Sequence, residues 1–431
     1  MQIESLYQIY LNHPSVQTDT RQLKSGDLFF ALKGPNFNGN LFADKALEQG
    51  ASFAVADEYS GIYADRVILV QDVLDTLQAL ALHHRKQFRI PFIAITGSNG
   101  KTTTKELVHA VLSTHYRTYT TRGNLNNHIG IPLTILGIRS DAEIAVIEMG
   151  ANHQGEIAGY CQYALPTHGI ITNAGKAHLE GFGGFDGVKK GKGELFDFMR
   201  SQGGSAFVMW DYNYLREMSV GIQEIVRYGT NDEEQVSGIV RRSEPYLEVE
   251  MKRGFEEGII STQLVGDYNL PNVLCAIAVG KYFKVGELQI RKAVESYSPS
   301  NSRSQLIELK SNHIILDAYN ANPSSMKAAI ENFSRIPVTD NKKVLLLGAM
   351  AELGPESLEE HRRIADLIGE FNWHRVALVG GDFQKIDHPY TRFNNAEEAR
   401  DWLKEEGIRD AYILIKGSRS MAMEKILDNI V

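Results

Sequence analysis

The sequence predicts an α/β protein of three domains. The chain has 431 residues, 43% of them hydrophobic and 23% charged, which is enough material for two or three soluble domains. Apolar runs of strand length alternate with amphipathic stretches of helical length, a pattern typical of parallel sheets covered by helices. A polar stretch, YSPSNSRSQ, interrupts the alternation near residue 300, after which it restarts. We therefore expect domains spanning residues 1–85, 86–300 and 301–431.

The first domain is expected to be a small α/β N-terminal module. Its short apolar runs, DLFFAL and SFAVA, are separated by turns rich in glycine and asparagine such as KGPNFNGN. The stretch DVLDTLQALALHHRKQF then has the apolar spacing of an amphipathic helix.

The second domain is expected to be a central P-loop-type doubly wound sheet. The apolar run FIAIT is followed by a glycine-rich turn and then by Leu107, Val108, Val111 and Leu112 at helical spacing. EIAVIEM and HGIITNA are further candidates for buried strands. Between about 225 and 265, runs such as YLEVEM and GIISTQLV predict an added β subsheet.

The third domain is expected to be Rossmann-like. Four apolar runs, HIILDAY, KVLLLG, RVALVG and AYILIKG, are separated by helical stretches such as ESLEEHRRIADLIGEF. Ligand sites are common in the clefts between such domains.

Composition excludes several classes of function. The net charge of -8 gives no broad basic surface for nucleic acid. The two cysteines, Cys161 and Cys275, lack the spacing of a zinc site and are expected to be buried free thiols. We see no signal peptide and no membrane span, so a cytoplasmic location is expected.

The stretch TGSNGKTTT, residues 96–104, has the chemistry of a phosphate-binding loop, although it is two residues shorter than the usual G-x-x-x-x-G-K-[ST] pattern. Gly97 and Gly100 permit close backbone approach to an anion, and successive N–H groups can surround phosphate oxygens. Lys101 supplies a positive charge and Thr102 a hydroxyl for Mg²⁺. The alternative is a tight turn with a surface lysine, but the strand before it and the helix after it favour nucleotide. The expected contacts are Gly97, Ser98, Asn99, Gly100, Lys101, Thr102 and Thr103.

Three further positions are ambiguous on their own. Glu148 ends an apolar strand, where it could hold Mg²⁺ or cap the following turn. His178 lies in a loop, where a histidine is usually a polar surface residue. Lys189, Lys190 and Lys192 lie on a predicted helix from about residue 187, and three such lysines usually form a solvated face.

Taken together, these motifs resemble the Mur ligase superfamily, the ATP-dependent amide-forming enzymes of peptidoglycan precursor synthesis, which also includes folylpolyglutamate synthetases. The short loop resembles the family's own G-x-x-G-K-[ST] cradle. TDTRQLKSGDLFFALKG resembles its nucleotide-sugar motif, and GNLNNHIGIP its G-N-x-N-N-x-I-G-x-P stretch. LLLGAMAELG and LIKGSRSMAME resemble its C-terminal segments, so the resemblance covers essentially the whole chain.

Within the family, DAYNANPSSM at residues 317–326 is similar to the ligases that add a dipeptide. The branch that adds the third peptide residue would show His-Thr-Pro-Asp and Asp-Asn-Pro-Arg strings, which do not occur here. The resemblance implies UDP-N-acetylmuramoyl-tripeptide and D-alanyl-D-alanine as substrates, ATP with two Mg²⁺ ions, an acyl-phosphate intermediate and a monomeric enzyme.

The resemblance also assigns roles. It implies that Lys101, Glu148, His178 and Lys192 are catalytic. Thr102 and Glu148 would bind one Mg²⁺ and His178 a second, with Lys192 carbamylated into a further metal ligand. Lys189 and Lys190 are the alternatives to Lys192. The nucleotide would also contact Asn269, Asn272, Arg303, Asp317 and Tyr319. Substrate would contact Thr18, Thr20 and Arg21 at the UDP-sugar, and Asn126, Asn127, Asn320, Asn322 and Arg419 elsewhere.

The chain departs from the family pattern at four places. Tyr268 stands where histidine is common, Ser302 where glycine precedes the arginine, NGNLF where an Asp-Gly-His-type string is frequent, and Ala349 where aspartate is usual. Three alternative functions remain: another amide ligase of the family, an NTPase that switches or moves a partner, and a binding paralogue with an inactive site. DAYNANPSSM argues against the first, the short loop against the second, and the retained Lys101, Glu148, His178 and Lys192 against the third.

Overall fold

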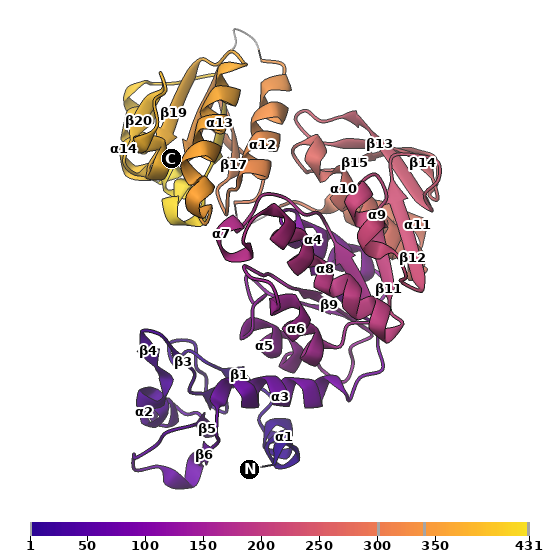
Figure 1. Cartoon of the computed structure of the whole chain (residues 1–431), viewed down its shortest axis with the longest axis vertical. Coiled ribbons are helices and arrows are strands. Elements are labelled where there is room, and N and C mark those ends of the chain that lie inside the picture. The colour runs from indigo at the N-terminus through magenta and orange to yellow at the C-terminus, as the bar shows by residue number, and fades with distance from the viewer. Residues whose placement is uncertain (1, 300–301, 339–341, 429–431) are drawn as a thin grey trace.

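The computed structural model describes residues 2–299, 302–338 and 342–428. Its strands form three main sheets, one after another along the chain, and a two-stranded ribbon (Figure 1). The mixed α/β architecture expected from the sequence is therefore confirmed. The predicted boundary between residues 300 and 301 lies outside the described residues, and the exact limits of the three domains stay predictions.

The N-terminal region contains a parallel four-stranded sheet of order β1-β2-β5-β6. Its elements are α1 (Ile3–Asn12), β1 (Val16–Gln17), β2 (Leu28–Phe30), β3 (Lys33–Gly34), β4 (Phe37–Asn38), α2 (Ala43–Glu48), β5 (Phe53–Ala56), β6 (Val67–Leu69) and α3 (Val73–Arg85). The predicted helix over DVLDTLQALALHHRKQF is confirmed as α3. It packs against α1 and against two helices of the middle region, α5 and α6, so it joins the two parts of the molecule.

The middle region contains a nine-stranded sheet of order β15-β14-β13-β12-β11-β10-β7-β9-β8. Its strands are β7 (Phe92–Thr96), β8 (Thr118–Thr120), β9 (Ile144–Glu148), β10 (His168–Ile171), β11 (Ser205–Met209), β12 (Glu224–Gly229), β13 (Val236–Arg242), β14 (Glu248–Arg253) and β15 (Gly258–Ser261). Its helices are α4 (Lys101–Leu112), α5 (Gly130–Leu136), α6 (Glu156–Ala164), α7 (Leu179–Phe182), α8 (Phe185–Gln202), α9 (Asn213–Ser219), α10 (Leu270–Tyr282) and α11 (Glu287–Ser296).

The expected β subsheet is present as an extension of the central sheet. Strands β13, β14 and β15 pair antiparallel with one another and continue the same sheet at one edge. The central strands β7 and β9 are buried along their whole length, which explains their unbroken apolar runs.

The C-terminal region contains a six-stranded sheet of order β16-β17-β21-β18-β19-β20. Its strands are β16 (Gln305–Leu309), β17 (Asn312–Asp317), β18 (Lys343–Gly348), β19 (Arg375–Val379), β20 (Thr391–Phe393) and β21 (Tyr412–Lys416), and its helices are α12 (Pro323–Arg335), α13 (Ser357–Gly369) and α14 (Ala396–Glu405). All four predicted strands are present and parallel. The sequence reasoning missed β16, which pairs antiparallel with β17, and β20 at the other edge.

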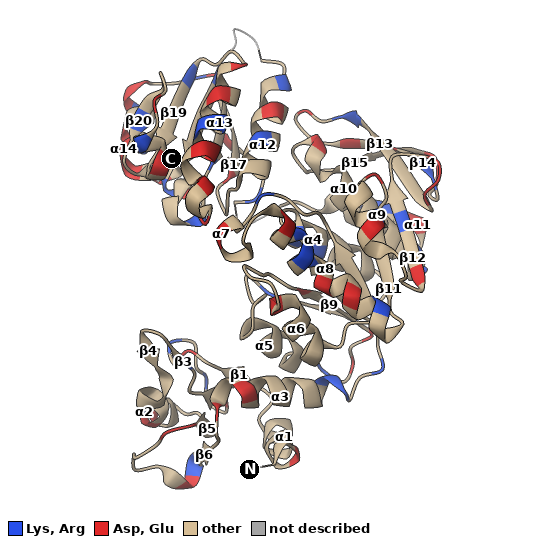
Figure 2. Cartoon of the chain, in the orientation of Figure 1, with Lys and Arg blue, Asp and Glu red and all other residues tan. Residues whose placement is uncertain are grey.

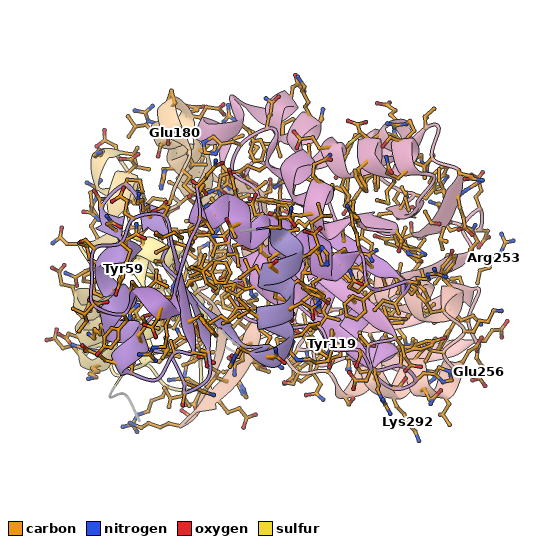
Figure 3. The ribbon with its side chains drawn as sticks, turned by 90° about the horizontal axis from the view of Figure 1, so that it is seen from below. Tyr59, Tyr119, Glu180, Arg253, Glu256 and Lys292 are labelled. Atoms are coloured by element: carbon orange, nitrogen blue, oxygen red, sulfur yellow. The ribbon has the colours of Figure 1, made fainter. Side chains whose placement is uncertain are left out.

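The surface agrees with the composition. Positive and negative residues are interspersed over the face seen in Figure 2, and the side chains of Arg253, Glu256 and Lys292 extend outward at the periphery in Figure 3. Cys161 and Cys275 are both buried and free. Among the described residues, no helix is both long and apolar enough to cross a membrane.

Candidate active site

A cavity of about 740 Å³ lies where the middle region meets the C-terminal region. It opens at the carboxyl ends of β7, β9 and β10, the edge where parallel sheets commonly bind ligands. The predicted site residues on its lining are Ser98, Asn99, Gly100, Lys101, Thr102, Thr103, Asn126, Asn127, Glu148, His178, Asn269, Asn272, Arg303, Asp317, Tyr319, Asn320 and Asn322.

The loop between β7 and α4 requires both of its glycines. Gly97 has φ +143° and Gly100 has φ +78°, conformations that side chains rarely adopt. A Cβ atom on Gly97 would lie 2.0 Å from Oγ1 of Thr172, and one on Gly100 would lie 2.6 Å from Oδ1 of Asn272. Thr172 and Asn272 therefore pack tightly against the loop. The loop leads into the N-terminus of α4, and helix N-termini favour anions.

Residues after β10 hold the loop in this shape. The backbone N–H of Ser98 donates to the carbonyl of Asn173, at 3.0 Å, and the N–H of Asn99 donates to Oδ1 of the same residue, at 3.0 Å. The hydroxyl of Thr172 donates to the carbonyl of Asn99, at 2.6 Å. The sequence reasoning did not single out Thr172 or Asn173. Polar residues directly after a buried strand were the available signal, as they were for Glu148.

Lys101 lies over the loop. Its Nζ donates to the carbonyls of Gly97, at 2.6 Å, and Ser98, at 3.2 Å. Burial lowers the pKa of Lys101 to about 8, opposed by Glu148 and reinforced by Arg303. The ammonium is thus held by weak neutral acceptors, which a phosphate could replace.

Glu148 lies at the end of β9 and is 1% exposed. Its Oε1 accepts from the hydroxyl of Thr102, at 3.1 Å, and from the side-chain amide of Asn126, at 2.8 Å. Its Oε2 is buried and has no hydrogen-bond partner. Buried carboxylate oxygens are rarely left without a partner, so this atom fits a cation better than it fits a turn cap.

His178 precedes α7 and lines the cavity. Its Nδ1 lies against Oε2 of Glu352, a residue of the C-terminal region, and this contact lowers the pKa of the Glu352 carboxyl. His178 is therefore not the exposed polar residue that a loop histidine usually is: it makes an interdomain contact, and only 19% of its side chain is exposed.

Burial distinguishes the three lysines of α8. Lys192 is 1% exposed, whereas Lys190 is exposed and Lys189 pairs with the exposed Asp186. The Nζ of Lys192 donates to the carbonyl of Ala151, at 3.0 Å, and lies 4.9 Å from the ring centroid of Phe182. Burial lowers the pKa of Lys192 well below its ordinary value, and the charge of Lys101 adds to the effect. Lys192 lies behind Ala151 rather than on the cavity lining.

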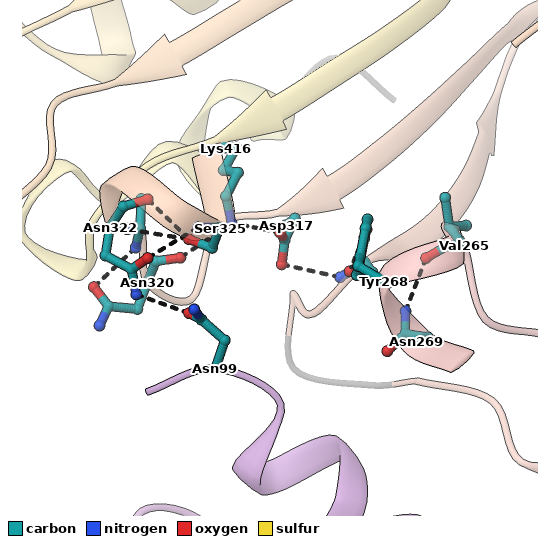
Figure 4. A network of polar contacts seen from close by, with 11 residues as sticks. Asn99, Val265, Tyr268, Asn269, Asp317, Asn320, Asn322, Ser325 and Lys416 are labelled. Atoms are coloured by element: carbon teal, nitrogen blue, oxygen red, sulfur yellow. Dashed lines mark hydrogen bonds and ion pairs between the residues drawn. The ribbon is translucent and has the colours of Figure 1, made fainter. Parts of the chain in front are cut away.

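The C-terminal region closes the cavity with a polar network (Figure 4). The side chain of Asn322 donates to that of Asn99 in the phosphate loop, at 2.7 Å, and also caps α12 through Ser325. Asp317 pairs with the buried Lys416, at 2.5 Å, a partner that the sequence reasoning missed. These contacts place the segment DAYNANPSSM, residues 317–326, against the phosphate loop.

The remaining nucleotide candidates lie on either side of this network. The guanidinium of Arg303 lies 3.7 Å from the ring centroid of Tyr319, a cation–π contact. Asn272 donates to Asn269, at 2.8 Å, and accepts from the hydroxyl of Thr104, at 3.0 Å, so it also supports the phosphate loop. Tyr268, found where histidine is common, hydrogen-bonds Ser304.

Several expected substrate residues lie apart from the cavity lining or have structural roles. Thr18, Thr20 and Arg21 belong to the N-terminal region, at the lower end of Figure 1, where Arg21 pairs with Asp19 at 2.7 Å. Arg419 pairs with Glu424 outside the lining. Asn127 lines the cavity, and its Oδ1 accepts from the N–H of Gly130 at the start of α5.

Comparison with known proteins assigns all three parts of the chain. Three family models match it: "Mur ligase family, catalytic domain" over residues 14–85, "Mur ligase middle domain" over 95–280, and "Mur ligase, glutamate ligase domain" over 302–425. The chain is 35% identical to the UDP-N-acetylmuramoyl-tripeptide–D-alanyl-D-alanine ligase of Bacillus subtilis, over 96% of this chain and 93% of that protein.

Solved structures agree. A crystal structure of MurF from Acinetobacter baumannii has a TM-score of 0.87 and 28% identity, covering 100% of this chain and 98% of that one. MurF from Thermotoga maritima in complex with ADP has a TM-score of 0.85 and 27% identity, covering 97% of each chain. With matches that span all three sheets and the cavity between the second and third, the chain belongs to the Mur ligase family.

Proposed function

We propose that this protein joins D-alanyl-D-alanine to the tripeptide of UDP-N-acetylmuramoyl-tripeptide, with the conversion of ATP to ADP and phosphate, in peptidoglycan precursor synthesis. One observation carries the proposal. The phosphate loop and the asparagine-rich segment Asp317–Met326 meet at one cavity, through Asn99 and Asn322, in a chain 35% identical over nearly its full length to a ligase named for this reaction.

The phosphate loop binds and orients ATP. The N–H groups around Gly100 and the N-terminus of α4 face the anion, and Lys101 exchanges its carbonyl partners for phosphate oxygens. Catalysis of phosphoryl transfer depends mainly on such positioning and charge neutralisation. Asn269, Asn272, Arg303, Asp317 and Tyr319 are proposed to complete the nucleotide site.

The donor set at the end of β9 fits Mg²⁺. Thr102 and Glu148 would hold one ion, since Oε2 of Glu148 is buried without a partner and Mg²⁺ prefers few carboxylates with water and phosphate. His178 would hold a second ion. When bound, the ions would neutralise charge that develops on the transferred phosphate.

Lys192 fits the expected carbamylation. Carbon dioxide reacts with a neutral amine, and burial favours the neutral form of this lysine. Its nearest polar contact is the carbonyl of Ala151, so no carboxylate neutralises it directly. The carbamate would convert a cation into an oxygen ligand beside the metal sites.

The reaction requires two substrates held away from water. The terminal carboxylate of the tripeptide attacks the γ-phosphate, and the dipeptide amine then displaces phosphate from the acyl carbon. Water would hydrolyse the acyl phosphate, so the site must exclude it. Asn126, Asn127, Asn320, Asn322 and Arg419 are proposed to orient the peptide parts, and Thr18, Thr20 and Arg21 the UDP-sugar. We also propose a cytoplasmic monomer, as the family resemblance implies.

The test is phosphate release by the purified protein with Mg-ATP and UDP-N-acetylmuramoyl-tripeptide, with and without D-alanyl-D-alanine. Diaminopimelate and lysine forms of the tripeptide are compared. Release that depends on the dipeptide, with a pentapeptide product by mass, supports the proposal and identifies the third residue. Release without dipeptide dependence would refute the acceptor and leave the ATP site intact.

A further inference from the structure

The loop after β10 is one of the docking elements between the middle and C-terminal regions. The backbone N–H of Lys176 donates to the hydroxyl of Ser324, at 3.1 Å, and its Nζ pairs with Glu360 on α13, at 2.6 Å. Glu360 is only 4% exposed. Figure 1 shows α7, which follows this loop, beside the lower end of the C-terminal region. One short loop therefore receives contacts from two helices of the other region.

Glu352 contacts the same loop at two points. Its carboxylate lies against Nδ1 of His178, and its backbone carbonyl accepts from the N–H of Glu180, at 3.4 Å. Close packing continues beside it, since a Cβ atom on Gly354 would lie 3.0 Å from Cβ of Glu180. Glu352 thus meets the histidine and the first turn of α7 together.

Both partners have an unusual backbone. His178 has φ +53° and Glu352 has φ +61°. The left-handed region costs an ordinary side chain roughly 1 kcal/mol or more, and such residues persist where the surroundings hold them. The two residues face each other across the interface in conformations that propensity alone would not select.

The chemistry of this pair is specific. Nδ1 of His178 lies within ion-pair distance of the Glu352 carboxylate but is not aligned for a hydrogen bond to it in this structure. A carboxylate this close to Nδ1 favours a hydrogen on that nitrogen, which would leave Nε2 with the free lone pair. Histidines that bind metals are commonly oriented in this way, by a carboxylate on the other nitrogen. Here the carboxylate and the histidine belong to different regions of the chain.

We propose that Glu352 is a positioning residue that fixes the tautomer and orientation of His178 when the C-terminal region docks. Docking would then complete the metal site, because the middle region alone supplies the histidine without its orienting group. This inference rests on the proposed function through the assignment of His178 as a metal ligand. It adds Glu352 to the proposed metal site and couples that site to docking of the C-terminal region.

The first test reads the tautomer in metal-free protein by ¹⁵N NMR of the histidine side chains, with His178→Asn to assign the signal. The Nδ1–H tautomer is expected in the wild type. Glu352→Ala should shift the signal toward Nε2–H, and Glu352→Gln should largely retain it, because the amide oxygen still accepts. Glu356→Ala, an exposed change on the same turn, is the matched control and should leave the signal unchanged. An unchanged tautomer in Glu352→Ala would overturn the inference.

The second test measures binding of Mn²⁺ in the presence of ADP by electron paramagnetic resonance. Glu352→Ala and His178→Asn should both weaken it, the former by about 10- to 100-fold. If His178→Asn weakens Mn²⁺ binding and Glu352→Ala does not, the positioning role is refuted while the metal assignment stands. If neither variant weakens it, the metal assignment itself fails and the inference falls with it.

Discussion

Replacement of Glu148 by glutamine should separate stability from activity. In the ligand-free protein, Oε1 accepts two hydrogen bonds and the buried Oε2 accepts none. A buried polar atom without a partner costs about 1–3 kcal/mol, and a charged one costs more. Glutamine keeps the accepting oxygen and replaces a buried charge with a neutral amide. The lost attraction to Lys101 offsets part of this gain. We expect the variant to be more stable than the wild type by about 1 kcal/mol.

Activity should change in the opposite direction. Loss of the carboxylate from the proposed Mg²⁺ site removes about 3 kcal/mol of charge stabilisation, which corresponds to a rate lower by about 100-fold. The assays are urea unfolding in buffer with EDTA, and ADP release under saturating Mg-ATP. Glu143→Gln is the matched control, because Glu143 is exposed and lies just before the other end of the same strand.

The two outcomes that would refute this reasoning are distinct. If Glu148→Gln destabilises the ligand-free protein by more than about 1 kcal/mol, the carboxylate is a structural cap, since caps contribute stability of that size. If the variant retains the wild-type rate, the atom without a partner does not bind the metal. Glu143→Gln should show neither effect.

Three further predictions concern the phosphate loop, Lys192 and the buried His168. Gly100→Ala should lower the free energy of unfolding by about 2–4 kcal/mol and abolish nucleotide binding, because Gly100 has a positive φ and an added Cβ would clash with Asn272. Calorimetry with ADP checks this. The double variant Gly100→Ala with Asn272→Ala should regain part of the stability. Lys192→Ala should largely abolish ligase activity, with partial rescue by bicarbonate or a small acid; full activity in the untreated variant would contradict the assignment. Burial lowers the pKa of His168 to about 4, below its ordinary 6.5, so the unfolded chain binds a proton that the folded chain does not. Stability present above pH 6.5 should therefore fall by about 3 kcal/mol as the pH drops to 4. His168→Phe should reduce this loss in urea titrations, and an unchanged pH profile would contradict it.

The central and C-terminal strands were predictable because a strand buried on both faces consists of consecutive apolar residues. Strands such as β7, β9 and β18 are covered on both faces and are therefore unbroken apolar runs. The missed strand β16 is mostly half-buried, and β20 has three residues at a sheet edge, so neither carries a strong pattern. For the same reason, the sequence could not show whether the strands after residue 225 formed a separate layer.

The phosphate loop was predictable because its chemistry is local. Its glycines, lysine and threonine lie within a few residues of one another, between a strand and a helix. The partners of that loop were not predictable in the same way. Asn173 and Asn322 reach Asn99 from segments 74 and 223 residues away in sequence. Likewise, only burial in the folded chain distinguishes Lys192 from Lys190, which have the same side chain two residues apart.

Several costly features of this molecule lie at or beside the candidate active site. Glu148 has a buried oxygen without a partner, Lys192 is a buried amine without a carboxylate, and His178 and Glu352 have left-handed backbones. Each costs free energy of the order of 1–3 kcal/mol, a sizeable part of the 5–15 kcal/mol that stabilises a typical domain. A ligand present at 100 times its Kd stabilises the folded state by about 2.7 kcal/mol. Binding of the proposed nucleotide and metal would therefore offset part of the cost of these particular features, and that is a physical reason for a functional site to retain them.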